Sequence, residues 1–143
     1  MMIRSRILAT ESSGSILFIR LMVGGIFLSE GIQKFIFPAD LGSGHFLSIG
    51  FPMPYFTAYF TGLLEMGCSI LILAGLYTRL ATVPLLIITM FSIVAIQFPV
   101  MIDRGWWGML HAGRTDWCML LGTCYLLLKG GGRWSLDRKW WKW

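Results

Sequence analysis

Long apolar blocks set the first constraint on how this chain can fold. They run over about residues 15–37, 55–77, 81–100 and 113–129. A helix needs about 20 residues to cross a bilayer, and the first three blocks reach that length. Hydrophobic residues make up 56% of the 143-residue chain and charged residues only 13%, too few to cover the surface of a water-soluble domain. The sequence therefore predicts an all-α integral membrane protein, a single domain built as a bundle of four transmembrane helices.

The basic residues outside the apolar blocks indicate how such a bundle is oriented. Arg79 lies between the second and third blocks, and the two ends of the chain carry further cations: Arg4, Arg6, Lys129, Arg133, Arg138, Lys139 and Lys142. With four crossings, all these regions share one side of the membrane, and the positive-inside rule makes that side the cytoplasm. We therefore predict two cytoplasmic termini. Because the cations flank helices and form no folded basic face, nucleic acid is not expected as a partner.

The segments that join the blocks are predicted to be irregular. Residues 38–54 are rich in Gly, Pro and Ser, which disfavours a regular element. Residues 101–116, with the sequence MIDRGWWGMLHAGRTD, are predicted to form a second outer loop, with its tryptophan pair at the membrane interface. After the glycines at 130–132, residues 130–143 are expected to continue as a surface tail.

Charged side chains inside the first apolar block are the most unusual feature of the chain. At about 100° per residue, Arg20, Gly24, Gly31 and Lys34 share one face of a helix, and Glu30 lies at its edge. Glycines allow a neighbouring helix to come close. Charged groups within a membrane need something other than lipid to face. The sequence therefore predicts that this face points into the bundle.

The second and fourth blocks supply partners for these charges. Glu65 lies almost halfway along the second block, on a stripe of small and polar residues. Such a carboxylate should be protonated, paired with Arg20 or Lys34, or exposed to a wet cavity. Thr89, Ser92 and Gln97 of the third block, with Arg114, Asp116 and His111 near the outer end of the fourth, extend the polar cluster toward the outer leaflet.

We take this cluster as the candidate site. The candidates for proton exchange are Glu65, Glu30 and Asp116, and those for contact with a cofactor are Arg20, Lys34 and His111. Ionisable residues inside a membrane mark functional sites. A second interpretation is equally open, because satisfied ion pairs also fix how helices pack without doing any chemistry.

Cysteine and histidine chemistry finds little support in the sequence. Cys118 and Cys124 lie about 120° apart on a helix, which excludes a disulfide between them, while a pair between Cys68 and Cys118 stays open. The two histidines, His45 and His111, both fall in predicted outer loops without a cluster of metal-binding spacing. We expect no metal, haem or flavin.

Three stretches resemble the DoxX family of small bacterial membrane proteins in their order and spacing: RLMVGGIFLSEGIQKF, TGLLEMGCSILILAGLYTRLAT and GGGRWSLDRK. The resemblance runs from about residue 17 to residue 139 and implies a four-helix bundle in a bacterial inner (plasma) membrane. The family name comes from a subunit associated with a terminal quinol oxidase, and relatives include the membrane part of a thiosulfate:quinone oxidoreductase. Many relatives carry a histidine at the position of Glu30, so a role assigned to that histidine does not transfer directly.

Two functions follow as expectations. The first is a membrane subunit of a quinone-linked redox system, which binds a quinone headgroup or relays protons and takes its electrons from a partner. Whether the chain is itself an enzyme stays open. The second is a non-catalytic structural or assembly subunit of a larger membrane complex. A third, a transporter or channel, would require a homo-oligomer. Expected partners are membrane lipid, other membrane or redox subunits and further copies of the chain.

Overall fold

Helices make up every regular element in residues 12–140, the part of the chain that the computed structural model describes. The longer ones are α2 (Ile16–Ile36), α4 (Pro54–Ala74), α5 (Thr78–Ser92) and α7 (Arg114–Lys129). A π-helical turn, η1 (Ile93–Gln97), joins α5 to α6 (Phe98–Ala112), and the short helices are α3 (Ser43–Ser48) and α8 (Leu136–Trp140). Arg4, Arg6 and Lys142, three of the cations behind the predicted orientation, lie outside the described residues.

The membrane character of the chain is confirmed by the length and apolarity of its helices. Three segments suffice to cross a bilayer: Ile16–Ile36, Pro54–Ala74 and the 35-residue stretch Thr78–Ala112. Helix α7 has 16 residues, fewer than the roughly 20 of a typical span. Helices α2, α4 and α7 begin and end within about three residues of the first, second and fourth predicted segments. The third begins at Thr78 and continues past its predicted end at 100.

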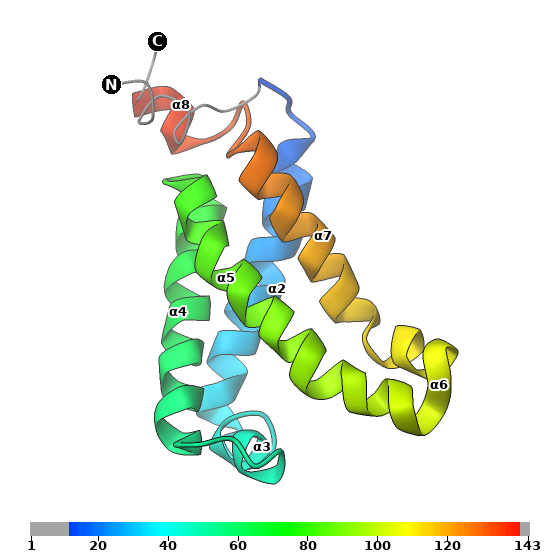
Figure 1. Ribbon diagram of the computed structural model, residues 1–143. Helices are drawn as coiled ribbons and strands as arrows, with labels where there is room; N and C mark the ends of the chain where they lie inside the picture. Colours follow the sequence, from blue (N-terminus) through cyan, green and yellow to red (C-terminus); the bar gives the residue numbers. More distant parts are fainter. Residues whose placement is uncertain (1–11, 141–143) are drawn as a thin grey trace.

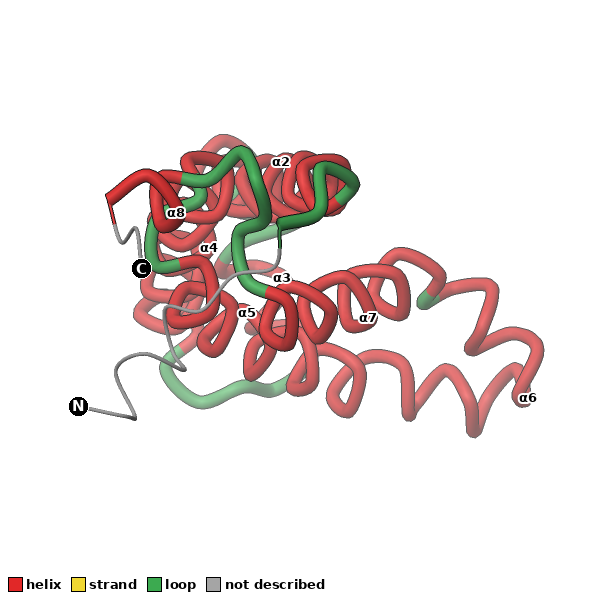
Figure 2. The backbone as a smooth tube through the Cα atoms, turned by 90° about the horizontal axis from the view of Figure 1, so that it is seen from above, coloured by secondary structure: helices red, strands yellow, loops and turns green. Residues whose placement is uncertain are grey.

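The helices are arranged as two pairs that diverge. Helix α2 packs along α4, and α5 packs along α7. Figure 1 shows the pairs close together near α8 and apart near α3 and α6, so the bundle has the shape of a wedge. In Figure 2, which looks along the bundle from above, α6 and the adjoining end of α7 project well away from α2 and α4.

Glycines bring α2 and α4 into close contact, as the sequence predicted. A Cβ atom on Gly24 would stand 2.7 Å from Leu73 Cγ, and one on Gly31 would stand 2.8 Å from the carbonyl oxygen of Gly62. Arg20, Gly24 and Gly31 are all buried. The glycine-bearing face of α2 therefore points into the bundle.

The Arg20 guanidinium ties α2 to the end of α4 and to the C-terminal segment. Nε donates to the carbonyl oxygen of Ile72 at 2.8 Å, and Nη2 donates to that of Leu73 at 2.5 Å. Nη1 donates to the carbonyl oxygens of Gly131 at 3.1 Å and Trp134 at 2.7 Å. The last carbonyls of a helix lack partners within the helix. Arg20 satisfies two of them at the end of α4, and its side chain is only 1% exposed.

Asp137 completes this closed end of the bundle, and for residues 130–140, the part that the structure describes, it corrects the prediction of a surface tail over 130–143. Its carboxylate accepts hydrogen bonds from the backbone N–H groups of Tyr77 at 2.6 Å and Thr78 at 3.0 Å, at the start of α5. Its own N–H donates to the carbonyl of Gly75 at 2.9 Å. Within the described range, the segment after Lys129 is therefore built into the fold because it satisfies helix ends that would otherwise lack partners.

Both predicted outer loops contain helix, which corrects the sequence interpretation. In the first, a Cβ on Gly44 would overlap the carbonyl oxygen of Ala39, so glycine here permits close packing of α3 and is not a sign of irregularity. In the second, α6 continues to Ala112 and bends at Gly105, whose φ of 71° and ψ of −177° suit glycine. Trp106 and Trp107 remain largely exposed, as interface residues should.

The α2–α4 contact predicts opposite effects for two glycines on different faces of α2. Gly31→Ala should destabilise the protein by roughly 1–3 kcal/mol, because the new Cβ meets the backbone of α4. Gly25→Ala is the matched control: the position is exposed, and a Cβ added there would meet no atom within 4 Å. This change should stabilise the helix by about 0.5–1 kcal/mol. Thermal unfolding of the purified variants in one detergent measures both. Equal effects would mean that the helices do not pack through this face.

Candidate functional site

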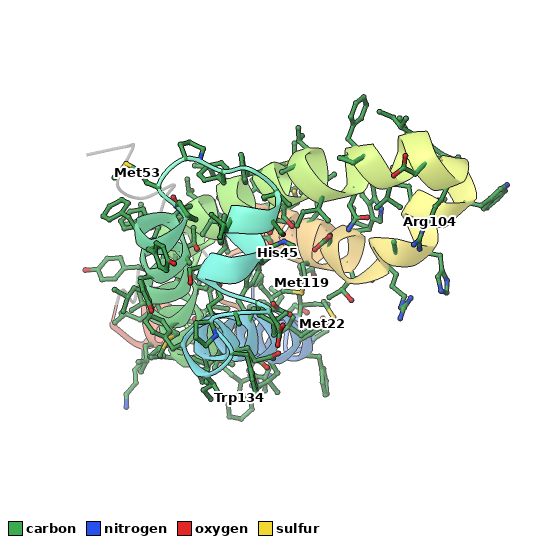
Figure 3. The ribbon with its side chains drawn as sticks, turned by 90° about the horizontal axis from the view of Figure 1, so that it is seen from below. Met22, His45, Met53, Arg104, Met119 and Trp134 are labelled. Atoms are coloured by element: carbon green, nitrogen blue, oxygen red, sulfur yellow. The ribbon has the colours of Figure 1, made fainter. Side chains whose placement is uncertain are left out.

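A cavity of about 590 Å³ lies where the two helix pairs diverge. Its wall comes from α2, α3, α4, α5, η1 and α7, and it is mainly apolar. The ionisable residues in the wall are Glu30, Lys34, His45, Glu65 and Asp116. Figure 3 looks into this end of the molecule and shows His45 on α3, with Met119 of α7 close by. Both residues line the cavity.

An ion pair between α2 and α4 forms one part of the wall. Lys34 Nζ lies 2.5 Å from Glu65 Oε2, and the two side chains are 13% and 4% exposed. Such short charge-assisted hydrogen bonds are among the stronger ones in proteins. Of the three states that the sequence allowed for Glu65, the structure shows pairing with Lys34 together with a position in a cavity wall.

The other two predicted carboxylates lie on different helices around the same cavity. Glu30 lies one turn before Lys34 on α2 and is exposed, in agreement with its predicted position at the edge of the inward face. Asp116 lies in the first turn of α7, where a helix N-terminus stabilises negative charge. Its Oδ2 accepts a hydrogen bond from Gln97 Nε2 at 2.7 Å.

Two of the predicted cofactor contacts lie elsewhere. Arg20 is buried at the closed end of the bundle with its nitrogens on backbone carbonyls, and His111 is exposed on α6 beside Arg114. Neither is among the residues that line the cavity. A cofactor role for either residue remains a prediction without geometric support.

His45 joins the site although the sequence did not indicate it as a site residue, and Gln97, predicted only as part of the polar cluster, contacts Asp116 in the cavity wall. His45 reaches the cavity because Gly42 and Gly44 pack against residues 34–39 and so hold α3 over the opening. Gln97 reaches Asp116 because η1 changes the helical register before α6. A histidine preceded by two closely spaced glycines was the available sequence signal for His45. The π-helical turn that places Gln97 has no comparable mark in the sequence.

Among the described residues, the cysteines form no disulfide and no cluster of metal ligands is present. Cys68, Cys118 and Cys124 are free thiols, so the Cys68–Cys118 pair left open by the sequence is not formed. Within residues 12–140, no three His, Cys, Asp or Glu side chains come together as metal ligands. The ionisable residues in the cavity wall can form hydrogen bonds, pair charges and exchange protons.

Apolar helices around a cavity that holds a buried ion pair define a multi-pass membrane protein with an internal polar site. A profile of the DoxX family matches residues 15–97, more than half of the chain. The chain belongs to the DoxX family. It is 49% identical, over 140 residues, to the uncharacterized membrane protein Rv3486 of Mycobacterium tuberculosis; the match covers 94% of this chain and 86% of that protein. No solved structure matches the chain.

The buried ion pair predicts strong coupling between its two members. Lys34→Met or Glu65→Met alone should destabilise the protein by roughly 3–5 kcal/mol, because each leaves an uncompensated charge in the interior. The double variant should recover most of that loss, since apolar side chains of similar volume replace the pair. A double-mutant cycle of unfolding free energies measures the coupling. Glu30→Gln, at an exposed position, is the control and should change stability by less than about 0.5 kcal/mol. Additive losses from the two single changes would contradict the pairing.

Proposed function

We propose that this protein is a membrane subunit of a quinone-linked redox system and that its cavity holds the headgroup of a lipophilic quinone. The observation that carries the proposal is a cavity of about 590 Å³ with apolar walls and the Lys34–Glu65 pair set into one of them. Ligand cavities range from about 300 to 1,000 Å³ and combine apolar walls with a few polar groups. The residues present therefore fit a flat, largely apolar ring with polar atoms at its edge.

Each charged group has a defined task in this proposal. Lys34 uses one N–H toward Glu65 and keeps two for a ligand oxygen. Glu65, Glu30 and Asp116 hold and release protons at the cavity wall. A bound quinone supplies two-electron, two-proton redox chemistry, and the electrons come from a partner subunit.

A second candidate function is a structural or assembly subunit of a larger membrane complex. The observation in its favour is that Arg20, Asp137 and the Lys34–Glu65 pair all find partners within the chain, as groups that only fix helix packing would. The two functions differ in one result: a structural subunit binds no quinone, and its variants affect the amount of assembled complex and not its turnover.

We propose further that the chain crosses the membrane four times, with α7 as the fourth crossing and α8 on the cytoplasmic side. This orientation is supported by five cations: Arg79 at the start of α5, Lys129 at the end of α7, and Arg133, Arg138 and Lys139 in or next to α8. These ends of α5 and α7 lie near α8 (Figure 1). The prediction is tested with single cysteines at Ser48 on α3 and at Arg138 on α8, in a chain whose three native cysteines are replaced. An impermeant maleimide added to intact cells should label the cysteine at 48, and the one at 138 only after the cells are opened. The reverse pattern would contradict the orientation.

Filling the cavity tests the quinone proposal directly. Ala95 lines the cavity, whereas its neighbour Val94 is exposed on the outside of the bundle. Ala95→Phe should weaken binding of a short-tailed benzoquinone by about tenfold or more, because the ring occupies ligand space, and Val94→Phe should leave it within about twofold. Binding to the purified protein, measured by calorimetry, gives both values. Absence of quinone binding by the unmodified protein would remove this proposal and favour the structural one.

A further inference from the structure

The π-helical turn η1 directs one amide side chain at the cavity wall. Inserting a π turn into an α-helix shifts the following residues around the axis, and such turns often occur at functional sites. Gln97, the last residue of η1, is 5% exposed and faces α7. Its Nε2 donates to Asp116 Oδ2 at 2.7 Å.

Close packing holds this amide in place. A Cβ on Gly113, the residue between α6 and α7, would stand 2.7 Å from Gln97 Cδ, so only glycine leaves room for the amide. Gln97 Oε1 is buried and has no hydrogen-bond partner among the described residues. A buried unpaired acceptor costs stability, and therefore packing alone does not explain an amide at this position. The hydrogen bond from its Nε2 to Asp116 does explain the amide.

The cavity wall is rich in hydrogen-bond acceptors. Ionised carboxylates only accept, and Glu30, Glu65 and Asp116 all line the cavity. The hydroxyl of Thr61 donates to the carbonyl of Thr57 at 2.7 Å, and that of Thr89 donates to Leu85 at 2.8 Å. Each hydroxyl proton is thus used within its own helix, so both hydroxyls can act toward a ligand only as hydrogen-bond acceptors.

Donors in the same wall are fewer. They are the remaining N–H groups of Lys34, the ring of His45 and the hydroxyls of Ser92 and Thr115, since the hydroxyl of Thr57 donates to the carbonyl of Pro52 at 3.5 Å. Lys34 and Asp116 belong to different helix pairs, so the cation and the amide-held carboxylate face the cavity from different walls. The Asp116 carboxylate can therefore accept a hydrogen bond from a ligand that carries a donor group.

We infer that Asp116, held by Gln97, recognises an O–H donor of the ligand, so that the cavity prefers the hydroquinone form to the acceptor-only quinone. The inference rests on the proposed function and adds the redox form that is bound. Asp116 contacts the ligand, and Gln97 is a positioning residue that acts through Asp116.

The test compares both redox forms on the same protein. The full chain in lipid nanodiscs is titrated, without oxygen, with a short-tailed benzoquinone and with its hydroquinone. The unmodified protein should bind the hydroquinone about tenfold more tightly, the worth of a good charge-assisted hydrogen bond. Asp116→Asn, whose amide can donate as well as accept, should reduce this preference to within about twofold.

Variants at Gln97 separate positioning from folding. Gln97→Met keeps the volume and removes the unpaired oxygen, so it should keep the melting temperature while lowering the hydroquinone preference about threefold or more. Gly113→Ala, which displaces the amide, should act in the same direction. Gln33→Met is the control, because that amide hydrogen-bonds Ser29 on its own helix. In the Asp116→Asn background, Gln97→Met should have no further effect on the preference.

Each outcome has a distinct meaning. Equal binding of the two forms by the unmodified protein would overturn the inference and leave the quinone site standing. Binding of neither form would overturn the proposed function and the inference together. A Gln97→Met change of equal size in both backgrounds would show that Gln97 does not act through Asp116.

Discussion

The Arg20 guanidinium at one end of the bundle is the contact on which the rest of the architecture depends. A cation buried in an apolar protein needs several acceptors at once, and here backbone carbonyls from α4 and from the C-terminal segment supply them. With Asp137 on the first N–H groups of α5, this end of the bundle is closed. The helix pairs therefore converge at α8 and diverge at the other end, where the cavity lies.

The charges of α2 thus have two different surroundings. Arg20 meets fixed backbone acceptors, which take four of its five N–H groups, and it is buried away from the cavity. Lys34 meets one carboxylate at the cavity wall and keeps donors free. Fourteen residues separate them in sequence and the same helical face carries both, so periodicity could not distinguish a cation that holds the fold from one placed at a site.

Where the sequence interpretation was wrong, glycine was the common cause. Glycine indicates either a break or a close approach, and the composition of residues 38–54 supports both equally well. Gly44 proved to allow the close packing of α3, and Gly113 the close approach of Gln97. In α6, the non-helical conformation of Gly105 turns the chain between two helical segments, so a glycine in a predicted loop marks a kink between helices.

The sequence by itself determined the membrane class, the bounds of most helices, the inward face of α2 and the family. These follow from local properties: the length of the apolar segments, the helical periodicity of their residues and the high cost of exposing charged side chains to lipid. Only the tertiary structure decided that Glu65 pairs with Lys34, that Arg20 and His111 lie away from the cavity, that His45 lines it and that Gln97 holds Asp116 in its wall. Such choices depend on the crossing of helices, and therefore on contacts between residues far apart in the chain.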